Sequence, residues 1–273
     1  MPKLLHVSDL HFGAEDRFAL GAVEAFAREE HVEGLIVSGD LTMRGKPSEF
    51  DAAAAWLSRF PMPVVATPGN HDTSYLNLAK RAWRPFRRYD RLLEPVAGFS
   101  LQTPHLFVAT LNTARGLQAR PNWALGAVSR SQIRRLEETF RDAPERLLRV
   151  VVCHHPLIGP PDNPLSGSTR NGWRAAAAMA EMGVDLVMTG HLHVPFVMPL
   201  PVGDGATWSI GAGTLSERQR GHPASFTVLR LQGPEPTSQA YFIDERGEIT
   251  HTHERTLCFR RRNAQEPKAL NQA

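Results

Sequence analysis

The sequence predicts an α/β fold, and two observations support that class. Short apolar runs alternate with segments of helical period along most of the chain. The runs are four to seven residues long and rich in leucine and β-branched residues, which is typical of strands buried on both faces. Strands that alternate with helices in this way indicate a sheet with helices packed against it.

Eight apolar runs are expected to form strands, and four other segments are expected to form helices. The strands are predicted at residues 4–7, 34–38, 63–67, 106–111, 147–152, 185–189, 207–210 and 225–231. The helices are predicted at residues 17–29, 47–60, 129–140 and 173–182.

Each predicted helix has its own sequence signal. The first is amphipathic and is expected to turn Phe18, Val23 and Phe26 toward a core. The second begins with a proline at its first turn. The third has Ser129 and Gln132 at the spacing of a capping box, and the fourth is rich in alanine.

Two regions depart from the alternation of strands and helices. Residues 73–123 contain the basic runs KRAWRPFRRYDR and RGLQARPNW, which suggest an insert or cap over one edge of the sheet. Residues 207–262 show no clear long helix and are expected to be rich in strands. We therefore expect one domain over residues 1–262, followed by a flexible tail at 263–273.

Composition bounds the class of protein. The chain has 273 residues, of which 42% are hydrophobic, and this is enough for a large core. A net charge of +3 is too small to indicate nucleic-acid binding by itself. Two cysteines argue against a disulfide framework, and no run of 18 apolar residues or signal peptide is seen. These features predict a cytoplasmic protein without a transmembrane segment.

Five polar clusters each follow a predicted strand, and six of the 12 histidines fall within them. The carboxyl ends of parallel strands meet at one edge of a sheet, where ligands of α/β proteins bind. The clusters are Asp9-Leu10-His11, Gly39-Asp40, Gly69-Asn70-His71-Asp72, His154-His155-Pro156 and Gly190-His191-Leu192-His193.

This combination of residue types suits a two-metal site. Such a site needs a bridging carboxylate and a mixture of imidazole and carboxylate ligands. Carboxylate and imidazole ligands suit manganese, iron, cobalt or zinc. A zinc site built from cysteine thiolates is not expected. Each cluster alone is a weak signal, since a single Asp-x-His is usually a surface turn, but the ordered set is strong.

The five clusters resemble the pattern of the calcineurin-like metallophosphoesterase family, which is D-x-H, GD, GNH[DE], H and GHxH in that order. The resemblance covers residues 3–213. It implies a four-layer αββα sandwich of two mixed β-sheets flanked by helices, with a dinuclear metal site at the C-terminal ends of the strands. The ligands implied are Asp9, His11, Asp40 and His193 for one divalent metal ion, and Asp40, Asn70, His154 and His191 for the other.

The resemblance also implies roles for three neighbouring residues. His71 would stabilise charge on the substrate or protonate the leaving oxygen. Asp72 would either orient His71 or cap the following helix. His155, counted with His71 and Asp72 as a candidate catalytic residue, would lie beside the ligands or at the rim of the site.

The expected reaction is hydrolysis of a phosphoester. Two divalent ions and two aspartates leave a net positive site, even with a metal-bridging hydroxide as the nucleophile, and such a site attracts a phosphodiester monoanion. The layout resembles the bacterial branch that contains cyclic-nucleotide and glycerophosphodiester phosphodiesterases. A phosphomonoesterase, a nucleotide-sugar pyrophosphatase and a nuclease remain as alternatives, and a non-catalytic scaffold is disfavoured by the complete ligand set.

The substrate is expected to be a small anionic phosphoester. Candidate contacts at the rim are Asn112, Arg115, Asn122, Arg218 and Arg220. The basic segment is interpreted as a solvated helix face or as a surface for a polyanion or an anionic lipid headgroup. Trp83, Phe86 and Tyr89 interleave with its arginines, and aromatic residues at this spacing more often pack in a core than stack on a base. Nucleic acid is not favoured as a partner, and a homo-oligomer is left open.

Overall fold

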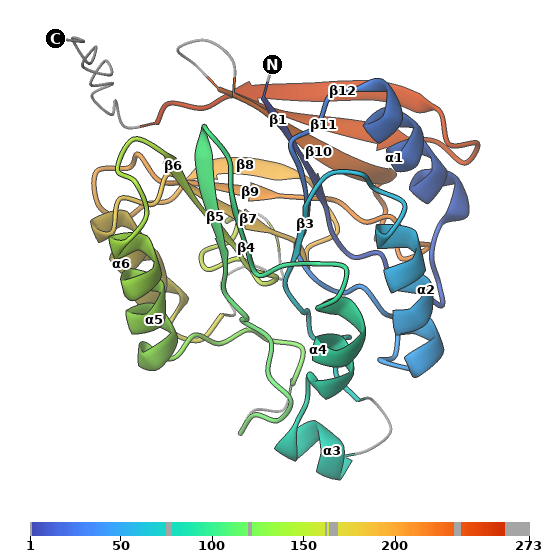
Figure 1. Ribbon diagram of the computed structural model, residues 1–273, viewed down its shortest axis with the longest axis horizontal. Helices are drawn as coiled ribbons and strands as arrows, with labels where there is room; N and C mark the ends of the chain where they lie inside the picture. The colour runs from blue at the N-terminus through green and yellow to red at the C-terminus, as the bar shows by residue number, and fades with distance from the viewer. Residues whose placement is uncertain are drawn as a thin grey trace, which may run out of the picture.

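Two six-stranded mixed β-sheets face each other in a computed structural model of the chain (Figure 1). The structure describes residues 2–74, 78–119, 122–161, 163, 169–231 and 236–259. The predicted tail at 263–273 lies outside the described residues.

The first sheet has the strand order β12-β11-β10-β1-β2-β3. Strands β1, β2 and β3 are parallel to one another, whereas β10, β11 and β12 continue the sheet in antiparallel fashion. The bounds are β1 Lys3–Val7, β2 Gly34–Val37, β3 Val64–Ala66, β10 Ala224–Arg230, β11 Thr237–Ile243 and β12 Ile249–Thr256.

The second sheet has the order β4-β5-β6-β7-β9-β8. Its four central strands are parallel, and the two edge strands β4 and β8 are antiparallel to their neighbours. The bounds are β4 Ser100–Gln102, β5 Leu106–Thr110, β6 Leu148–Val152, β7 Leu186–Thr189, β8 Phe196–Pro199 and β9 Trp208–Gly211.

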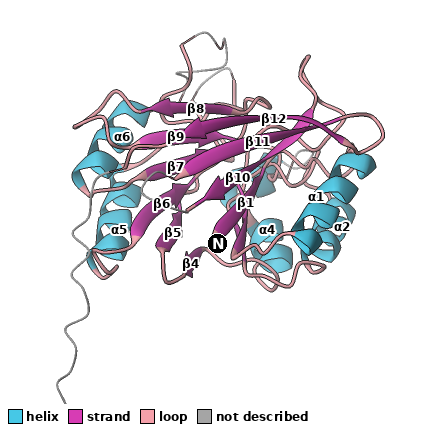
Figure 2. Ribbon diagram, turned by 90° about the horizontal axis from the view of Figure 1, so that it is seen from above, coloured by secondary structure: helices cyan, strands magenta, loops and turns pink. Residues whose placement is uncertain are grey.

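Helices cover the outer face of each sheet, as Figure 2 shows from above. On one side lie α1 Arg17–Glu29, α2 Pro47–Leu57 and α4 Arg87–Leu93, and on the other lie α5 Arg130–Arg141 and α6 Gly172–Glu181. The short helix α3 Leu78–Trp83 extends beyond α4, away from the sheets (Figure 1). The predicted four-layer αββα sandwich is therefore confirmed.

Three apolar clusters fill the three spaces between these layers. One joins α1 and α2 to the first sheet, and a second joins α5 and α6 to the other sheet. The third lies between the sheets and contains alternate residues of their strands, such as Leu4 and Ile36 against Val150 and Leu186. The alternation follows from the strand period of two, since Leu5 and Val7 face the helices instead. Each central strand is thus apolar on both faces, as the sequence predicted.

The predicted strands and helices are present with small shifts of their ends, but one side chain of α1 was placed wrongly. Val23 and Phe26 are buried, whereas Phe18 is 61% exposed. The buried stripe of α1 runs through Ala19, Leu20, Val23, Phe26 and Ala27, and residue 18 lies beside it on the first turn. Asp16 begins the helix by accepting hydrogen bonds from the backbone N–H groups of Phe18 and Ala19.

The basic segment at 73–123 has two structurally different halves. Its first half forms α3 and α4, which lie outside both sheets. Its second half contains β4 and β5, which are strands of the second sheet. The second half is therefore part of the second sheet and is not a cap over it. Strand β4 is an edge strand of three residues with two exposed positions, so it carries little apolar signal in the sequence.

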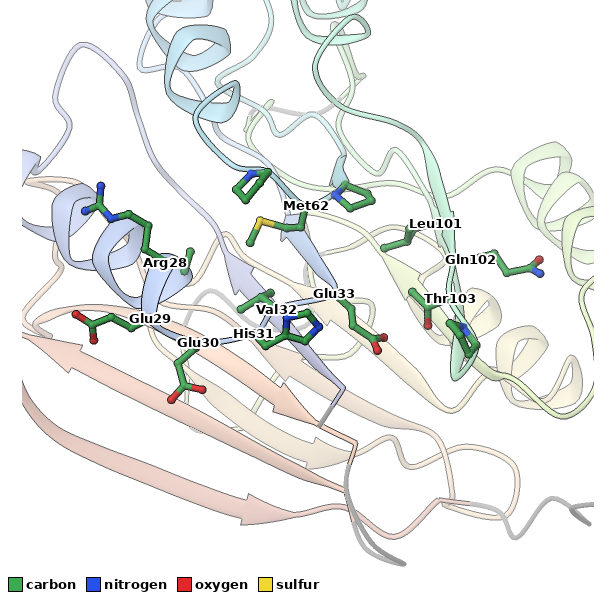
Figure 3. A pocket seen from close by; sticks show the side chains of 14 residues that line it. Arg28, Glu29, Glu30, His31, Val32, Glu33, Met62, Leu101, Gln102 and Thr103 are labelled. Carbon is green, nitrogen blue, oxygen red and sulfur yellow. The ribbon is translucent and has the colours of Figure 1, made fainter.

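A cavity of about 900 Å³ opens at the edge of the sheets where β2 and β3 begin (Figure 3). Glu30, Glu33, Met62 and Thr103 are among the residues that line it. None of the predicted site residues lies there. Among the described residues, no helix is both long and apolar enough to cross a membrane.

Candidate metal centre

The predicted ligands gather at the opposite edge, where the parallel strands end. Asp9 follows β1, Asp40 follows β2, Asn70 follows β3, His154 follows β6 and His191 follows β7. The seven predicted ligands are all buried, and the carboxylate and imidazole groups among them form overlapping clusters. Side chains from both sheets therefore meet in one place, as expected for the carboxyl ends of parallel strands.

The backbone is unusual at these residues. Seven non-glycine residues in the described part of the chain have positive φ, and five of them are predicted ligands. Such conformations cost of order 1–3 kcal/mol each and persist where the surrounding structure enforces them, often at functional sites. The five ligands are Asp9, His11, Asp40, His191 and His193, with φ between 46° and 68°.

Two glycines allow the strand ends to approach closely. A Cβ atom on Gly69 would lie 2.1 Å from Oδ1 of Asp40, and one on Gly190 would lie 1.7 Å from the hydroxyl oxygen of Ser8. Any side chain at these positions would collide with the loops that carry the ligands. The glycine of the Gly-Asn-His-Asp cluster and that of the Gly-His-Leu-His cluster are thus required by packing around the ligands.

One half of the cluster contains Asp9, His11 and His193. The carboxylate oxygen Oδ1 of Asp9 lies 3.0 Å from Nε2 of His193 and 3.7 Å from Nε2 of His11. The two Nε2 atoms lie 3.4 Å apart. The other carboxylate oxygen of Asp9 accepts a hydrogen bond from the backbone N–H of His191, at 2.9 Å. Asp9 therefore ties the β1 loop to the β7 loop across the two sheets.

The other half is centred on Asp40. Its Oδ2 lies 3.3 Å from Nε2 of His154 and 3.9 Å from Nε2 of His11, so the carboxylate reaches both halves of the cluster. Its Oδ1 accepts a hydrogen bond from the backbone N–H of His71. The His191 ring centroid lies 5.2 Å from that of His154. The amide oxygen of Asn70 is buried in this region.

Three histidines share one orientation. The Nδ1 atoms of His11, His154 and His193 lie 3.4, 2.8 and 2.6 Å from the backbone carbonyls of Thr42, Ser38 and Arg218. A carbonyl can only accept, so Nδ1 carries the proton of each neutral ring and the lone pair lies on Nε2. All three Nε2 atoms therefore point at a carboxylate or at another imidazole, and metal-binding histidines are oriented in the same way by backbone carbonyls.

Unpartnered buried atoms show that the cluster fits a metal ion. Oδ1 of Asp9, Oδ1 of Asn70 and Nε2 of His154 make no hydrogen bond to any described residue. Buried polar atoms without partners are costly, and electron-pair donors that face one another need a cation between them. Burial lowers the pKa of His11 to about 4 and that of His191 to about 3, which keeps these imidazoles in the neutral form that binds metals.

His154 behaves differently from these two rings. Burial acts to lower the pKa of His154, but the adjacent Asp40 carboxylate outweighs it and raises the pKa to about 9. The charge of Asp40 thus favours uptake of a proton at Nε2 of His154 when no metal is bound. A divalent ion coordinated by both residues would replace this proton, since ligands must be deprotonated to bind.

His71 lies next to the cluster but has different partners. Its ring centroid is 4.8 Å from that of His11. Its Nδ1 donates to the carbonyl oxygen of Met43 at 2.7 Å, and its Nε2 lies 3.1 Å from the guanidinium of Arg218. Arginine can only donate, so the Nε2 atom of His71 accepts. The guanidinium of Arg218 thus contacts Nε2 of His71, whereas in the other histidines Nε2 is the atom that would bind a metal.

Among the described residues, the Asp72 carboxylate contacts neither the His71 side chain nor the start of a helix, so neither predicted role of Asp72 gains support from its contacts. Its carboxylate accepts hydrogen bonds from the backbone N–H groups of Leu41, Thr42 and Gly69 and from the Thr42 hydroxyl. Burial, followed by the charge of Asp40, raises the pKa of Asp72 to about 6. Asp72 holds the loop after Asp40 against the loop before Asn70, and the Met43 carbonyl takes the orienting role for His71.

Both ring nitrogens of His155 have hydrogen-bond partners, although one of them lies within 4.8 Å of ligand atoms of His154 and His191. Its Nε2 donates to the carbonyl of Ala124 at 2.8 Å, and its Nδ1 lies 2.9 Å from the Thr113 hydroxyl. Burial holds its pKa well below the usual value. Its ring packs 4.5 Å from that of His191, centroid to centroid. The contacts therefore give His155 a packing role behind the ligands and do not support a catalytic one.

The five candidate substrate contacts divide into two groups. Arg218 contacts His71, and Arg220 donates to the His191 carbonyl at 3.1 Å, so both lie at the cluster. Arg115 donates to the carbonyls of Asn112 and Ala114, and the side-chain oxygens of Asn112 and Asn122 accept from Ala114 and Ala124 in local turns. Among the described residues, no hydrogen bond or ion pair joins Asn112, Arg115 or Asn122 to a predicted ligand, and the contacts given above are local.

Several groups that orient the histidines in and beside the cluster were not predicted. They are the backbone carbonyls of Ser38, Thr42, Met43, Ala124 and Arg218, and the Thr113 hydroxyl. A carbonyl group carries no residue-type signal, so the sequence could not have identified the first five. Thr113 lies three residues after β5, at the same edge of the sheets as the other clusters. This position after a predicted strand could have identified Thr113 as a candidate.

Comparisons with known proteins identify a family and distant relatives of this chain. The sequence model described as calcineurin-like phosphoesterase matches residues 2–195. The chain is 25% identical over 167 residues to the glycerophosphodiester phosphodiesterase GpdQ of Enterobacter lignolyticus, covering 56% of this chain and 57% of that protein. It is 24% identical over 215 residues to the 3',5'-cyclic adenosine monophosphate phosphodiesterase CpdA of Escherichia coli, covering 70% and 69%. The chain thus spans little more than half of the first of these relatives.

Solved structures share the fold at low sequence identity. A dimetal phosphatase from Danio rerio superposes with a TM-score of 0.64 at 11% identity, over 94% of this chain and 98% of that chain. The purple acid phosphatase PPD1 from yellow lupin gives a TM-score of 0.65 at 12% identity, over 95% and 54%. The predicted resemblance to a bacterial phosphodiesterase branch is confirmed as a distant relationship. Because the family match covers more than half of the chain and includes the buried aspartate and histidine cluster, the chain belongs to the calcineurin-like phosphoesterase family.

Proposed function

We propose that this protein hydrolyses phosphodiesters at a centre of two divalent metal ions. The observation that carries the proposal is the arrangement of three imidazoles whose Nε2 atoms face carboxylates or one another. The diester preference is supported by the distant relatives, which are named as phosphodiesterases. The identity of the metals, among manganese, iron, zinc and cobalt, stays open.

Asp9, His11, Asp40 and His193 would hold one ion, and Asp40, Asn70, His154 and His191 would hold the other. Asp40 is the candidate bridge because its Oδ2 lies near imidazoles of both sets. Ions bound there would polarise the phosphoryl oxygens and lower the pKa of a coordinated water. Asn70 is a neutral ligand, so the ligand set carries only the charges of Asp9 and Asp40, and the centre stays net positive.

The protein's own groups beside this centre suit a phosphoryl group in transfer. Arg218 and Arg220 lie at the cluster, and guanidinium groups bind phosphoryl oxygens with two parallel hydrogen bonds. A phosphoryl group that takes hydrogen bonds from Arg218 would compete with Nε2 of His71 for the guanidinium. The released Nε2 would take up a proton from solvent, and the resulting imidazolium would face the substrate, where it can stabilise charge or pass that proton to the leaving oxygen.

Replacing His71 with alanine is expected to separate catalysis from metal binding. The variant should bind metal as the wild type does, because His71 is outside the ligand set, and it should lose about 10²–10³-fold in kcat on a diester with a poor leaving group. Metal content and kcat would be measured on the same preparation. His31→Ala, an exposed histidine at the far edge of the sheets, is the control. Full turnover by His71→Ala would exclude the proposed role.

Replacing Arg218 with glutamine is expected to lower kcat/KM by about 10–100-fold. The transition state would lose a hydrogen bond from a charged group, which contributes about 1.5–3 kcal/mol. Arg246→Gln, an exposed arginine in the turn between β11 and β12, is the matched control. Steady-state kinetics on a diester would test this. A kcat/KM equal to that of Arg246→Gln would show that Arg218 only positions His193 and His71.

The function itself is tested by comparing a diester with a monoester. The protein would be stripped of metal with a chelator, reloaded with Mn²⁺, and assayed with bis(p-nitrophenyl) phosphate and p-nitrophenyl phosphate. Mn²⁺-dependent turnover that strongly favours the diester is the expected result. Preference for the monoester would show a phosphatase, and absence of turnover of both compounds by the reloaded protein would refute the proposal.

A further inference from the structure

Helices α3 and α4 form a basic pocket whose lining is distinct from the predicted metal ligands. The pocket has a volume of about 680 Å³, and Arg84, Arg87, Arg88 and Arg91 line it together with Trp83. We call it the α3–α4 pocket. Its other walls include Pro47 and Asp51 of α2 and Ser74. None of the predicted metal ligands lines it.

The protein balances only part of the positive charge in this pocket. No ion pair is formed by Arg84, Arg87, Arg88 or Arg91 among the described residues. Asp51 is the acidic residue in the lining, whereas Asp90 of α4 is outside it. Four guanidinium groups around one concave surface repel each other, and an anion would relieve this repulsion.

The aromatic residues of the α3–α4 segment differ in how far they are buried. Tyr89 is buried at 2% exposure and packs in the apolar cluster beneath the first sheet, where Phe86 also packs. Trp83 lines the pocket and is 84% exposed. The prediction that these aromatic residues pack in the core thus holds for Tyr89 and fails for Trp83. An indole left in solvent beside arginines offers a flat face on which a planar ring can stack.

One wall of the pocket, formed by α4, packs against the rest of the fold. Helix α4 packs on α2, and Arg88 donates to the carbonyl oxygen of Gly45 at 2.6 Å. Gly45 lies against the backbone of Thr73, where a Cβ atom would be 2.1 Å from the Thr73 carbonyl oxygen. Arg88 is therefore held in place by the loop that follows the ligand Asp40, while Arg84, Arg87 and Arg91 are exposed and free to contact a ligand.

We infer that the α3–α4 pocket binds a nucleotide, with its phosphate on the arginines and its base on Trp83. Arginine binds phosphate oxygens in bidentate fashion, and stacking of a base on an aromatic side chain contributes to affinity for every base type. The volume is within the range of small-molecule sites, roughly 300–1,000 Å³. A concave pocket suits a nucleotide better than a flat membrane surface. The inference does not depend on the reaction at the metal centre.

The test is binding of AMP to the metal-loaded protein, measured by titration calorimetry. Arg87→Gln/Arg91→Gln is expected to weaken binding at least tenfold, because it removes two charged hydrogen-bond donors. Trp83→Leu should also weaken it, since the base loses its stacking partner. Arg134→Gln/Arg135→Gln removes two exposed arginines from α5 and should bind AMP as the wild type does.

His191→Ala distinguishes the two sites, because it disrupts the metal centre and leaves the pocket intact. Retained AMP affinity in His191→Ala, together with loss in Arg87→Gln/Arg91→Gln, supports the pocket, even if the protein has no phosphodiesterase activity. The reverse pattern would overturn the inference, because AMP would then bind at the metals. A short single-stranded oligonucleotide measured in parallel shows whether the nucleotide is free or part of a strand. Binding to vesicles of anionic lipid without binding of AMP or oligonucleotide would also overturn it.

Discussion

Replacing Asp40 with alanine is expected to remove bound metal and phosphoester turnover together. Asp40 is 2% exposed, and its Oδ2 lies between the imidazoles of His154 and His11, which belong to different halves of the cluster. Loss of this carboxylate would leave each proposed ion with one ligand fewer and with less negative charge nearby. Loss of an outer partner of a metal ligand costs about 10–100-fold in affinity, and loss of a shared ligand should exceed that.

Metal content after dialysis and turnover of bis(p-nitrophenyl) phosphate would be measured on the same samples. Asp142→Ala, at an exposed residue that ends α5, is the control for loss of one carboxylate. Far-UV circular dichroism would show that the variant is folded. Wild-type metal content in folded Asp40→Ala would contradict the assignment of Asp40 as the bridge between the two ions.

Replacing Gly69 with alanine is expected to destabilise the protein and to lower its metal affinity. The added Cβ would lie 2.1 Å from Oδ1 and 2.4 Å from the backbone nitrogen of Asp40. The backbone atom cannot rotate away, so the loops after β2 and β3 must separate. Such overpacking costs about 1–3 kcal/mol or more, and here it also displaces a proposed ligand.

Gly21→Ala, the same substitution in an open position, is expected to stabilise the protein. Gly21 lies on the exposed side of α1, and nothing lies within 4 Å of a Cβ atom built there. Alanine should stabilise that helix by about 0.5–1 kcal/mol. Thermal unfolding of both variants, with and without chelator, is the measurement. Equal melting temperatures for the two variants would mean that the loops tolerate a side chain at residue 69.

The sequence could predict the layers of this fold because each central element carries a local signal. The run LLHV is mostly apolar, as expected of a strand buried on both faces, and it forms most of β1 in the first sheet. Ser129 and Gln132 at capping-box spacing mark the start of α5, and both capping interactions are present. Strand β12 gave no such signal, because all eight of its residues are exposed at the edge of the sheet. Its pairing with β11 comes from backbone hydrogen bonds that any residue type can make.

The sequence by itself determined the family of this chain and its set of candidate ligands, since those depend on residue type and on order along the chain. Asp9, Asp40 and His191 each follow an apolar strand, and parallel strands end at one edge whatever their separation in the chain. Only the tertiary structure decided how the neighbours of these residues are used. Asp72 holds a backbone loop, His155 is saturated by Thr113 and Ala124, and Trp83 faces a basic pocket instead of the core. The reason is that hydrogen-bond partners and burial are set by segments distant in sequence, and most of those partners are backbone groups common to all residues.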